Sequence, residues 1–410
     1  MHTRTNAATL SPPEKEKLMN AIITLKKTTK PGHSTNVYDE FVAIHFGVTR
    51  RTGIASGDGG HGGPAFFAWH REFILRFEKA LQEVDPDVTL PYWKWESGNS
   101  SDTTNIFTAD FLGTMGLQTS GYLSETPNTQ NPDGWKVDSQ LDQGNGSTLL
   151  RNNNINPGSL PVSDANDALD EDDFHRFRPN LEGPHGTIHM IVGGHMTRMT
   201  SPNDPIFFLH HANIDRLWAK WQLTHPGTDN YNPNQTGNVG HKLDDRMWPW
   251  DGGDSSTTVN SVVALLPVFD TNDTRRPRDV LDIEALDYVY DDVEGSSKWI
   301  TSDSGQNNNS NQNNNGNRCF IATAAYGSEL EPPVQFLREF RDDVILQGKC
   351  KKTFESILNV YYKFSPPIAE QMRKNKPFKI IMKYSIVFPF VALAKITALL
   401  ISPFTKKRWK

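Results

Sequence analysis

The chain has 410 residues, more than an average domain needs and enough to bury a sizeable hydrophobic core. Its net charge of −6 gives no support for nucleic-acid binding, because nucleic-acid-binding proteins present a basic face to the phosphates. The only two cysteines, Cys319 and Cys350, lie in the last quarter, which excludes a disulfide framework or a cysteine-held metal in the rest of the chain. Any metal held before Cys319 must therefore be held by nitrogen or oxygen.

The composition changes three times along the chain. Residues 1–10 are polar and lack the apolar segment of a secretory signal peptide, so none is expected. Residues 1–295 are rich in aromatic side chains and are predicted to form one domain. Residues 296–317 include a tract of almost pure Asn and Gln, which cannot bury a core and predicts a disordered linker. Residues 318–378 are predicted to form a C-terminal module, followed by a basic, apolar tail over 379–410.

Helical patterns dominate the first domain. In chain order they cover Val37–Phe46, Pro64–Val84, Pro184–Val192 and Asp204–Gln222. The last segment opens with Asp then Pro, a helix N-cap followed by a residue suited to the first turn. Between these segments lie long stretches rich in Asn, Gly and Ser, such as 97–173, and no run alternates convincingly with a period of two. The sequence therefore predicts a mainly α fold, a four-helix bundle with long irregular loops.

Six histidines fall on or beside these helices in two groups of three. The first group has one member on the first helix, one in the glycine-rich loop that follows, and one on the second helix: His45, His61 and His70. In the second group, His185 and His189 are four residues apart and leave the same helix face, and His211 lies on the last helix. Facing helices of a bundle build metal sites from such inward side chains. For any one histidine taken alone, a buried core residue is the alternative interpretation.

The chemistry around these histidines favours copper. Three neutral imidazoles per ion suit copper, zinc, iron or nickel, and copper binds most tightly in the affinity series. A di-iron bundle site would need several carboxylates in Glu-x-x-His motifs, whereas the neighbours here are mostly aromatic or aliphatic. Two ions held by nitrogen in an apolar shell could together reduce O2.

Two long motifs carry a family resemblance. GHGGPAFFAWHREFILRFEKAL, followed by DPDVTLPYWKWE, is similar to the copper A region of tyrosinases, and EGPHGTIHMIVGGHM, followed by SPNDPIFFLHHANIDRLWAKWQ, is similar to their copper B region. The resemblance to the tyrosinase and catechol oxidase family of type 3 dicopper proteins covers roughly residues 4–291. It implies two copper ions, with His45, His61 and His70 binding copper A and His185, His189 and His211 binding copper B. It also implies copper-dependent oxidation of o-diphenols, and hydroxylation of monophenols such as tyrosine, to o-quinones with O2.

The resemblance assigns further roles on the last helix. In the doublet His210–His211 the family uses the second histidine as the ligand, and His195 is not expected to be one. Phe207, one turn before His211, is expected to cover the metal pair with its ring. Asp215, one turn after His211, is expected to orient a ligand imidazole through its distal nitrogen, or else to pair with a surface Lys or Arg.

Other positions depart from the family pattern. Glu182 resembles the glutamate that holds a water for deprotonating a monophenol, or else it is a carboxylate stabilised by a helix N-terminus. Many tyrosinases have Asn after the first copper B histidine, where this chain has Gly186, which weakens the expectation of monophenol hydroxylation. Some members tie the second copper A histidine to a cysteine, but no cysteine is available here, so His61 is expected to be held by packing alone. Arg198 and Met199 lie in a loop that could choose substrates.

The C-terminal part resembles a module known as the CFI box, through CFIATAAYGSELEPPVQFLREFRD and YYKFSPPIAE, for which a structural or sorting role is expected. Residues 384–405 follow with a single charge, Lys395, and are long enough to span a bilayer. A membrane contact and a surface helix packed on its own module are equal alternatives.

Three functions share these six histidines. The leading prediction is a polyphenol oxidase acting on small phenolic substrates and O2. The alternatives are an o-aminophenol oxidase and a reversible oxygen carrier like molluscan haemocyanin. Carriers usually come as repeated arrays, whereas this chain has one copy of the motifs. The physiological phenol, the oligomeric state and the compartment do not follow from the sequence.

Overall fold

A computed structural model describes residues 1–50, 58–225, 231, 240–253, 265–267, 269–293 and, further on, 337, 368, 376–389, 391, 394, 395 and 397. The chain divides into two compact units. The first comprises Met1–Glu284 and Tyr288–Ser297, and the second comprises Ala285–Asp287 and Lys298–Lys410. The linker predicted at 296–317 lies outside the described residues, as does most of 318–378, so the boundaries predicted there stay predictions.

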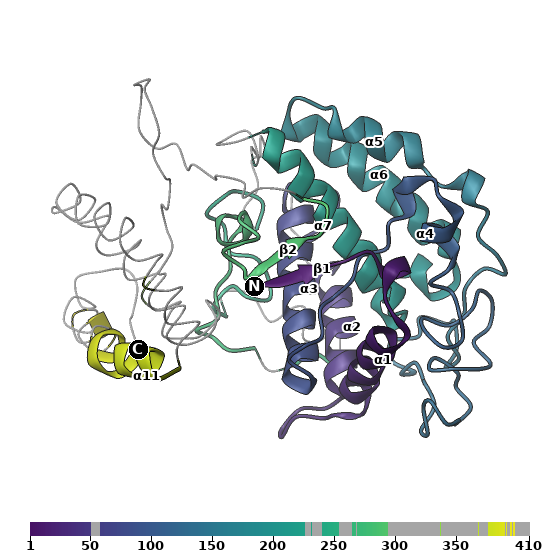
Figure 1. Ribbon diagram of the computed structural model, residues 1–410, viewed down its shortest axis with the longest axis horizontal. Helices are drawn as coiled ribbons and strands as arrows, with labels where there is room; N and C mark the ends of the chain where they lie inside the picture. Colours follow the sequence, from purple (N-terminus) through teal and green to yellow (C-terminus); the bar gives the residue numbers. More distant parts are fainter. Residues whose placement is uncertain are drawn as a thin grey trace. The chain divides into compact units, whose positions relative to one another are not determined.

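The first unit is mainly helical, as predicted. Its α-helices are α1 (Pro12–Lys27), α2 (Val37–Val48), α3 (Ala65–Val84), α4 (Ser100–Thr104), α5 (Val162–Leu169), α6 (Phe174–Val192) and α7 (Ile206–Thr224). Short 3₁₀ turns join them at Ala7–Thr9, Trp95–Ser97, Pro157–Ser159, Gly194–Thr197, Ser201–Asn203 and Pro277–Val280. The four helices predicted to hold the histidines are α2, α3, α6 and α7, with α1 packed beside α2 and α3 (Figure 1).

Side-chain caps explain where several helices begin. The Asn36 side chain accepts a hydrogen bond from the Asp39 amide at the start of α2, and Asp173 accepts one from Arg176 at the start of α6. Such caps satisfy backbone N–H groups that have no partner inside the helix.

Helix α6 is longer than predicted. It begins at Phe174, ten residues before the predicted start at Pro184, and runs through two prolines, Pro179 and Pro184. Proline lacks an N–H, so Pro184 leaves the carbonyl of Asn180 without its helical donor. Asn180 is exposed, and water can take the donor's place. The stretch 97–173, expected to be irregular, also contains α4 and α5.

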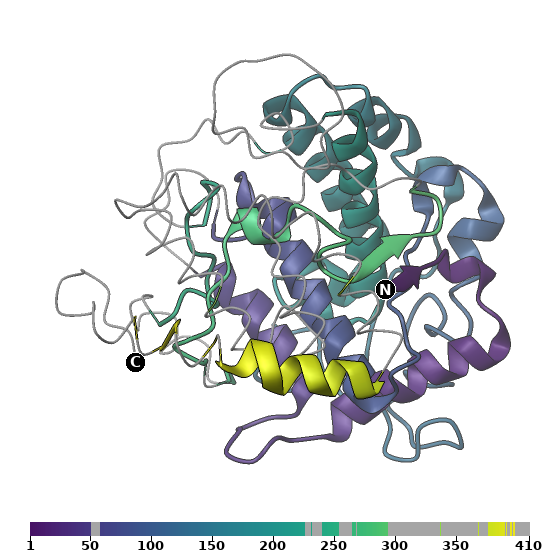
Figure 2. The same ribbon diagram turned by 60° about the vertical axis from the view of Figure 1, so that its left-hand side comes forward.

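Two short strands join the ends of the first unit. Strand β1 (His2–Arg4) pairs in parallel with β2 (Tyr288–Tyr290), His2 lying opposite Tyr288 and Arg4 opposite Tyr290. They lie side by side in Figure 1 and Figure 2. Neither strand shows an alternating pattern long enough to be predicted from sequence.

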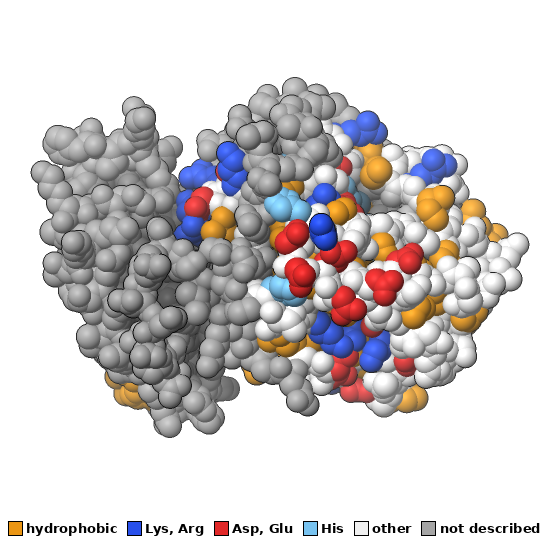
Figure 3. All heavy atoms as spheres, turned by 90° about the horizontal axis from the view of Figure 1, so that it is seen from above, with side chains coloured by type: hydrophobic (Ala, Val, Ile, Leu, Met, Phe, Trp, Pro, Cys, Tyr) orange, Lys and Arg blue, Asp and Glu red, His pale blue; other side chains and the backbone are white. Residues whose placement is uncertain are grey.

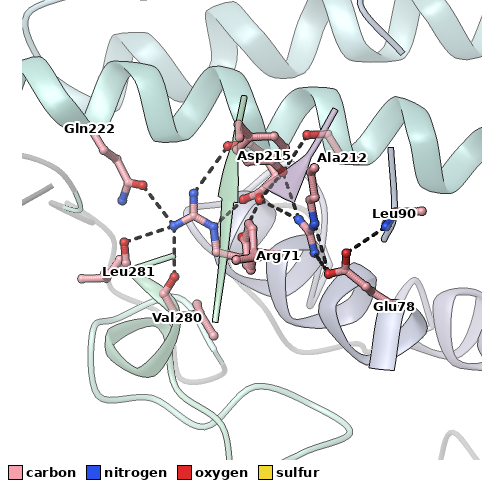
Figure 4. Close-up of polar contacts among 11 residues, drawn as sticks. Arg71, Glu78, Leu90, Ala212, Asp215, Gln222, Val280 and Leu281 are labelled. Carbon is pink, nitrogen blue, oxygen red and sulfur yellow. Dashed lines mark hydrogen bonds and ion pairs between the residues drawn. The ribbon is translucent and has the colours of Figure 1, made fainter. Parts of the chain in front are cut away.

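A buried cluster of charged side chains lies beside the paired strands β1 and β2 (Figure 4). Arg4 forms an ion pair with Glu78 of α3 at 2.7 Å and with Asp215 of α7 at 3.2 Å. Arg71 of α3 also pairs with Asp215, and its guanidinium donates to the carbonyls of Val280 and Leu281 at 3.0 and 3.2 Å. Figure 4 shows Arg71 reaching α7 and the 277–280 turn at once. The four charged side chains are at most 3% exposed and balance one another in sign.

The hydroxyl groups of both β2 tyrosines complete the cluster. Tyr288 and Tyr290 each donate a hydrogen bond of 2.6 Å to Asp215. Their contact with this carboxylate and their burial raise both pKa values well above that of a free tyrosine, so the phenols stay neutral donors. The cluster therefore ties α3 and α7, two histidine-bearing helices of the bundle core, to both ends of the unit.

In the second unit the structure describes a short helix, α11 (Lys376–Met382), continued by a π-helical turn at Lys383–Val387. Among the described residues no helix combines the length and apolar character needed to cross a bilayer. Residues 390, 392, 393, 396 and 398–405 of the predicted membrane contact lie outside the described residues.

Replacing the shared carboxylate, Asp215→Ala, should destabilise the first unit by about 3–5 kcal/mol, because the buried guanidinium of Arg71 loses its counter-charge and that of Arg4 loses one of its two. Thermal or urea unfolding measures the change. Asp87→Ala is the matched control: Asp87 pairs with Lys17 at 3.4 Å on the surface, and loss of an exposed pair costs about 0–1 kcal/mol. Equal losses in the two variants would contradict the role given to the buried cluster.

Candidate metal centre

The first histidine group converges in the structure. His45 comes from α2, His61 from the loop before α3, and His70 from α3. One ring nitrogen of each lies within 4.8 Å of the others. Their rings pack at 4.9–5.7 Å between centroids, edge-on or tilted. The structure therefore brings together all three residues predicted for copper A.

The second group converges as well. His185 and His189 point from one face of α6, and His211 comes from α7. The Nε2 atom of His185 lies 3.2 Å from that of His211 and 3.0 Å from that of His189. The adjacent His210 also has a ring nitrogen within the cluster distance.

Backbone carbonyls set the direction of most of these rings. The Nδ1–H groups of His45, His70 and His189 each donate to a carbonyl at 2.8 Å, those of Met199, Phe66 and Met196 respectively. His185 Nδ1 makes a longer contact of 3.3 Å with the carbonyl of Glu182. Binding the proton at Nδ1 leaves the Nε2 lone pair of each ring free for a metal.

The donor set fits a metal better than it fits a hydrogen-bond network. The Nε2 atoms of His45 and His70 are buried and have no hydrogen-bond partner among the described residues. Buried polar atoms normally have one, so these two atoms point to a ligand. Neutral imidazoles in an apolar surround suit copper, and the two groups suit the two copper ions of a type 3 site.

His210 is already engaged on both sides of its ring. Its Nδ1 accepts a hydrogen bond from the Trp95 indole at 3.1 Å, and its Nε2 contacts the carbonyl of His185 at 3.3 Å. Its ring also stacks on that of His185, with 5.1 Å between centroids. These contacts favour His210 as the residue that positions His185, and they leave His211 as the ligand candidate of the doublet.

The two groups adjoin each other. The rings of His70 and His211 stack at 4.3 Å, so one member of each group lines the same space. Phe66 contacts both groups, at 4.9 Å from His70 and 4.8 Å from His185. Phe207 does the same, at 4.9 Å from His45 and 4.1 Å from His211, and is fully buried. Aromatic rings thus enclose the space between the groups and exclude water.

The carboxylates take other positions than the sequence suggested. Asp215 was expected to orient a ligand imidazole or to pair at the surface. It does neither, because its oxygens are buried and taken by Arg4, Arg71, Tyr288 and Tyr290. The Nδ1 of His211 has no partner among the described residues.

Glu182 bridges the two halves of the site. One carboxylate oxygen accepts a hydrogen bond from the Gly62 amide at 2.6 Å, and the other pairs with Arg178 one turn earlier on α6. Glu182 therefore joins α6, which bears His185 and His189, to the loop that carries His61. Its side chain is 16% exposed, and a Cβ atom added at nearby Gly186 would meet nothing within 4 Å.

Sequence reasoning missed two residues that hold the glycine-rich loop. Asp58 contacts the Nδ1 of His61, at 3.1 and 3.2 Å from its two oxygens, so His61 is not held by packing alone. An Asp three residues before a loop histidine was the available signal. His241 accepts a hydrogen bond from the Ala65 amide at the start of α3, at 3.2 Å. It lies far along the chain in a segment without periodicity, and no local signal pointed to it.

The remaining predicted loop residues lie at the edge. His195 is buried outside both groups, with its Nδ1 accepting from the Leu150 amide at 3.1 Å. Met199 is 50% exposed while its carbonyl holds His45. Arg198 is exposed beside it.

Burial keeps the imidazoles neutral. Desolvation, with smaller contributions from neighbouring histidines, lowers the pKa of His45, His70, His185 and His211 well below the ordinary value. Burial lowers the pKa of His189 from 6.5 to about 4. A lowered pKa means that protons compete less well with a metal for these nitrogens.

Comparison with known proteins decides the family. Residues 35–224 match the common central domain of tyrosinase. The chain is 35% identical over 272 residues to a tyrosinase of Streptomyces glaucescens, with 61% of this chain and 93% of the relative covered. The chain belongs to the tyrosinase family.

Other relatives agree. A tyrosinase of Streptomyces antibioticus is 35% identical over 267 residues, covering 61% of this chain and 93% of its own length. The grixazone synthase of Streptomyces griseus is 29% identical over 295 residues, with 61% of this chain and 94% of the relative covered.

The metal-free protein should lose stability as the pH falls from about 7 to about 5. Folded His189 stays neutral in this window, because its pKa is lowered to about 4, whereas in the unfolded chain it takes up a proton near 6.5. The unfolded state then binds more protons, so the free energy of unfolding decreases with falling pH. Thermal melts of the metal-free protein measure this. A melting temperature that rises as the pH falls through this range would contradict it.

Proposed function

We propose that this chain is a copper-dependent phenol oxidase that converts o-diphenols, and monophenols such as tyrosine, to o-quinones with O2. The adjoining of the two histidine groups carries this proposal, since ions held by the two groups would lie close enough to act together on one O2 molecule. Copper A is assigned to His45, His61 and His70, and copper B to His185, His189 and His211. Membership of the tyrosinase family supports both the metal and the reaction.

The bound copper pair supplies the exchange of electrons between phenol and O2, and the protein supplies order around it. Carbonyl-anchored imidazoles hold the ligand nitrogens in fixed directions. Phe66 and Phe207 keep water from the enclosed side. Four of the six imidazoles are buried, whereas those of His61 and His189 are partly exposed, the side chain of His61 by 22%. The phenol is therefore expected to approach over His61 and His189.

Monophenols need a proton acceptor. A phenol hydroxyl has a pKa near 10, so a base must take its proton at neutral pH. Glu182 is the candidate, because its carboxylate lies on the His61 side of the site next to Gly62. Its hydrogen bond to Gly62 and its pair with Arg178 leave lone pairs for a water, through which the proton would pass.

Other partners fit this chemistry less well. Acidic side chains gather in the middle of the face seen in Figure 3, and with the net charge of −6 they disfavour a nucleic-acid backbone. Membrane contact through residues 384–405 stays a prediction. The oligomeric state is open.

The ligand assignment predicts that His211→Gln binds about one copper ion per chain where the parent protein binds two, because one nitrogen of copper B is lost. Metal analysis of reconstituted protein measures this. His195→Gln is the matched control, a buried histidine outside both groups, and should keep both ions. The assignment is wrong if His211→Gln keeps full copper, or if the parent binds fewer than two.

The second prediction concerns tyrosine. Gly186→Asn should raise the ratio of L-tyrosine to L-DOPA turnover several-fold, because the amide would hold a water beside Glu182 while the space around position 186 admits it. Gly183→Asn is the control, since this site on the same helix is equally open but exposed. An unchanged ratio in Gly186→Asn, or an equal rise in Gly186→Asn and Gly183→Asn, would contradict the role of Glu182 and position 186 in holding the water. Absence of any turnover of L-DOPA by the copper-loaded parent would refute the proposed function itself.

A further inference from the structure

His61 differs from the other five proposed ligands in its support. It lies in a loop rather than on a helix, and its side chain is 22% exposed. The histidines on helices inherit their direction from the helix, and four of them donate Nδ1–H to backbone carbonyls. A loop gives no such constraint, and glycines at 59, 60, 62 and 63 surround His61. Something else must hold its imidazole.

One carboxylate meets this need. Asp58 Oδ1 accepts hydrogen bonds of 2.7 Å from the amides of both Gly60 and His61. The same oxygen lies 3.1 Å from His61 Nδ1, and Oδ2 lies 3.2 Å from it. The Asp58 amide in turn donates to the carbonyl of His61 at 2.9 Å, which closes the turn. Asp58 thus fixes both the backbone and the ring of this residue.

We propose that Asp58 is a positioning residue that holds His61 with its Nε2 lone pair directed at copper A, in place of covalent attachment of this histidine. Nδ1–H donates to a charged acceptor, and such hydrogen bonds are about twice as strong as those to neutral carbonyls. A carboxylate partner also makes the imidazole a stronger donor to a metal. This inference rests on the proposed assignment of His61 as a ligand.

The loop has a second, independent anchor. The Gly62 amide donates to Glu182 of α6 at 2.6 Å, so the fold of the loop does not depend on Asp58 alone. Removing Asp58 is therefore expected to loosen the His61 ring more than the surrounding chain. Because the ring and the loop backbone are held by different contacts, the effect of Asp58 on His61 can be measured separately from its effect on the stability of the protein.

Two substitutions separate the contributions of Asp58. Asp58→Asn keeps a carbonyl oxygen for the two amides but removes the negative charge facing the imidazole. Asp58→Ala removes both. Asp138→Ala is the matched control, because Asp138 accepts from the Gln140 amide in a similar turn at 2.8 Å and faces no histidine.

The measurement is copper titration of the metal-free full-length protein against a competing chelator, with thermal melts alongside. The affinity for one of the two ions should fall about 10- to 100-fold in Asp58→Asn and further in Asp58→Ala, with the melting temperature of Asp58→Asn unchanged. Variants loaded with one copper ion instead of two should show the electron paramagnetic resonance signal of a single Cu(II) ion that is not coupled to a second. Asp138→Ala should match the parent in both measurements.

The outcomes separate this inference from the proposed function. If the parent binds two ions and Asp58→Asn binds both with parental affinity, Asp58 acts only on the turn and the inference is overturned. If Asp58→Asn binds copper more weakly but its melting temperature also falls, general destabilisation would explain the weaker binding, and the inference would be overturned too. If the parent itself fails to bind two ions, the ligand assignment fails and the inference falls with it.

Discussion

The site depends on hydrogen bonds from the Nδ1–H groups of the imidazoles, because these bonds fix the direction in which each Nε2 points. An imidazole can offer either nitrogen to a metal, and six freely turning rings would rarely face inward together. Carbonyls of Phe66, Met196 and Met199 bind Nδ1–H and so decide which nitrogen remains. Two of these carbonyls come from the loop between α6 and α7. This irregular segment therefore orients His189 of the helix just before it and His45 of α2, which is far away in the sequence. Its irregular backbone frees carbonyls that a helix would have used internally.

The second constraint is the balance of buried charge. Two guanidinium groups and two carboxylates share one dry region, which is tolerable only because each charge is paired and hydrogen bonded. Arg71 directly follows His70, and Asp215 comes one turn after His211. The pair therefore connects the helix that bears His70, of the first histidine group, to the helix that bears His211, of the second. Stability and metal geometry are linked through these two side chains.

The sequence predicted the helices and the six histidines well because both leave local signals. Hydrophobic periodicity marked α2, α3 and α7, and long motifs marked the six histidines that the fold brings together in two groups. Where local rules competed, the prediction failed: Pro184 suggested a helix start, although α6 runs through it with Asn180 open to solvent. Partners brought together only by folding could not be predicted. Asp215 looked like a partner for an imidazole one turn away, but Arg4 and Tyr290 reach it from the two ends of the unit.

The pairing of β1 with β2 has a consequence for the order of assembly. Arg4 is made long before the strand that lies opposite it, because that strand, and the phenol groups that share the Asp215 carboxylate, lie at residues 288–290. Until then Asp215 of α7 lacks the two hydrogen bonds that it accepts from Tyr288 and Tyr290, and domains generally complete folding as units. Nearly the whole of the first unit must therefore be synthesised before its buried charge cluster is complete. We therefore expect the metal site to become complete only after residues 288–290 have been made, so that metal is taken up after synthesis of the unit rather than during it.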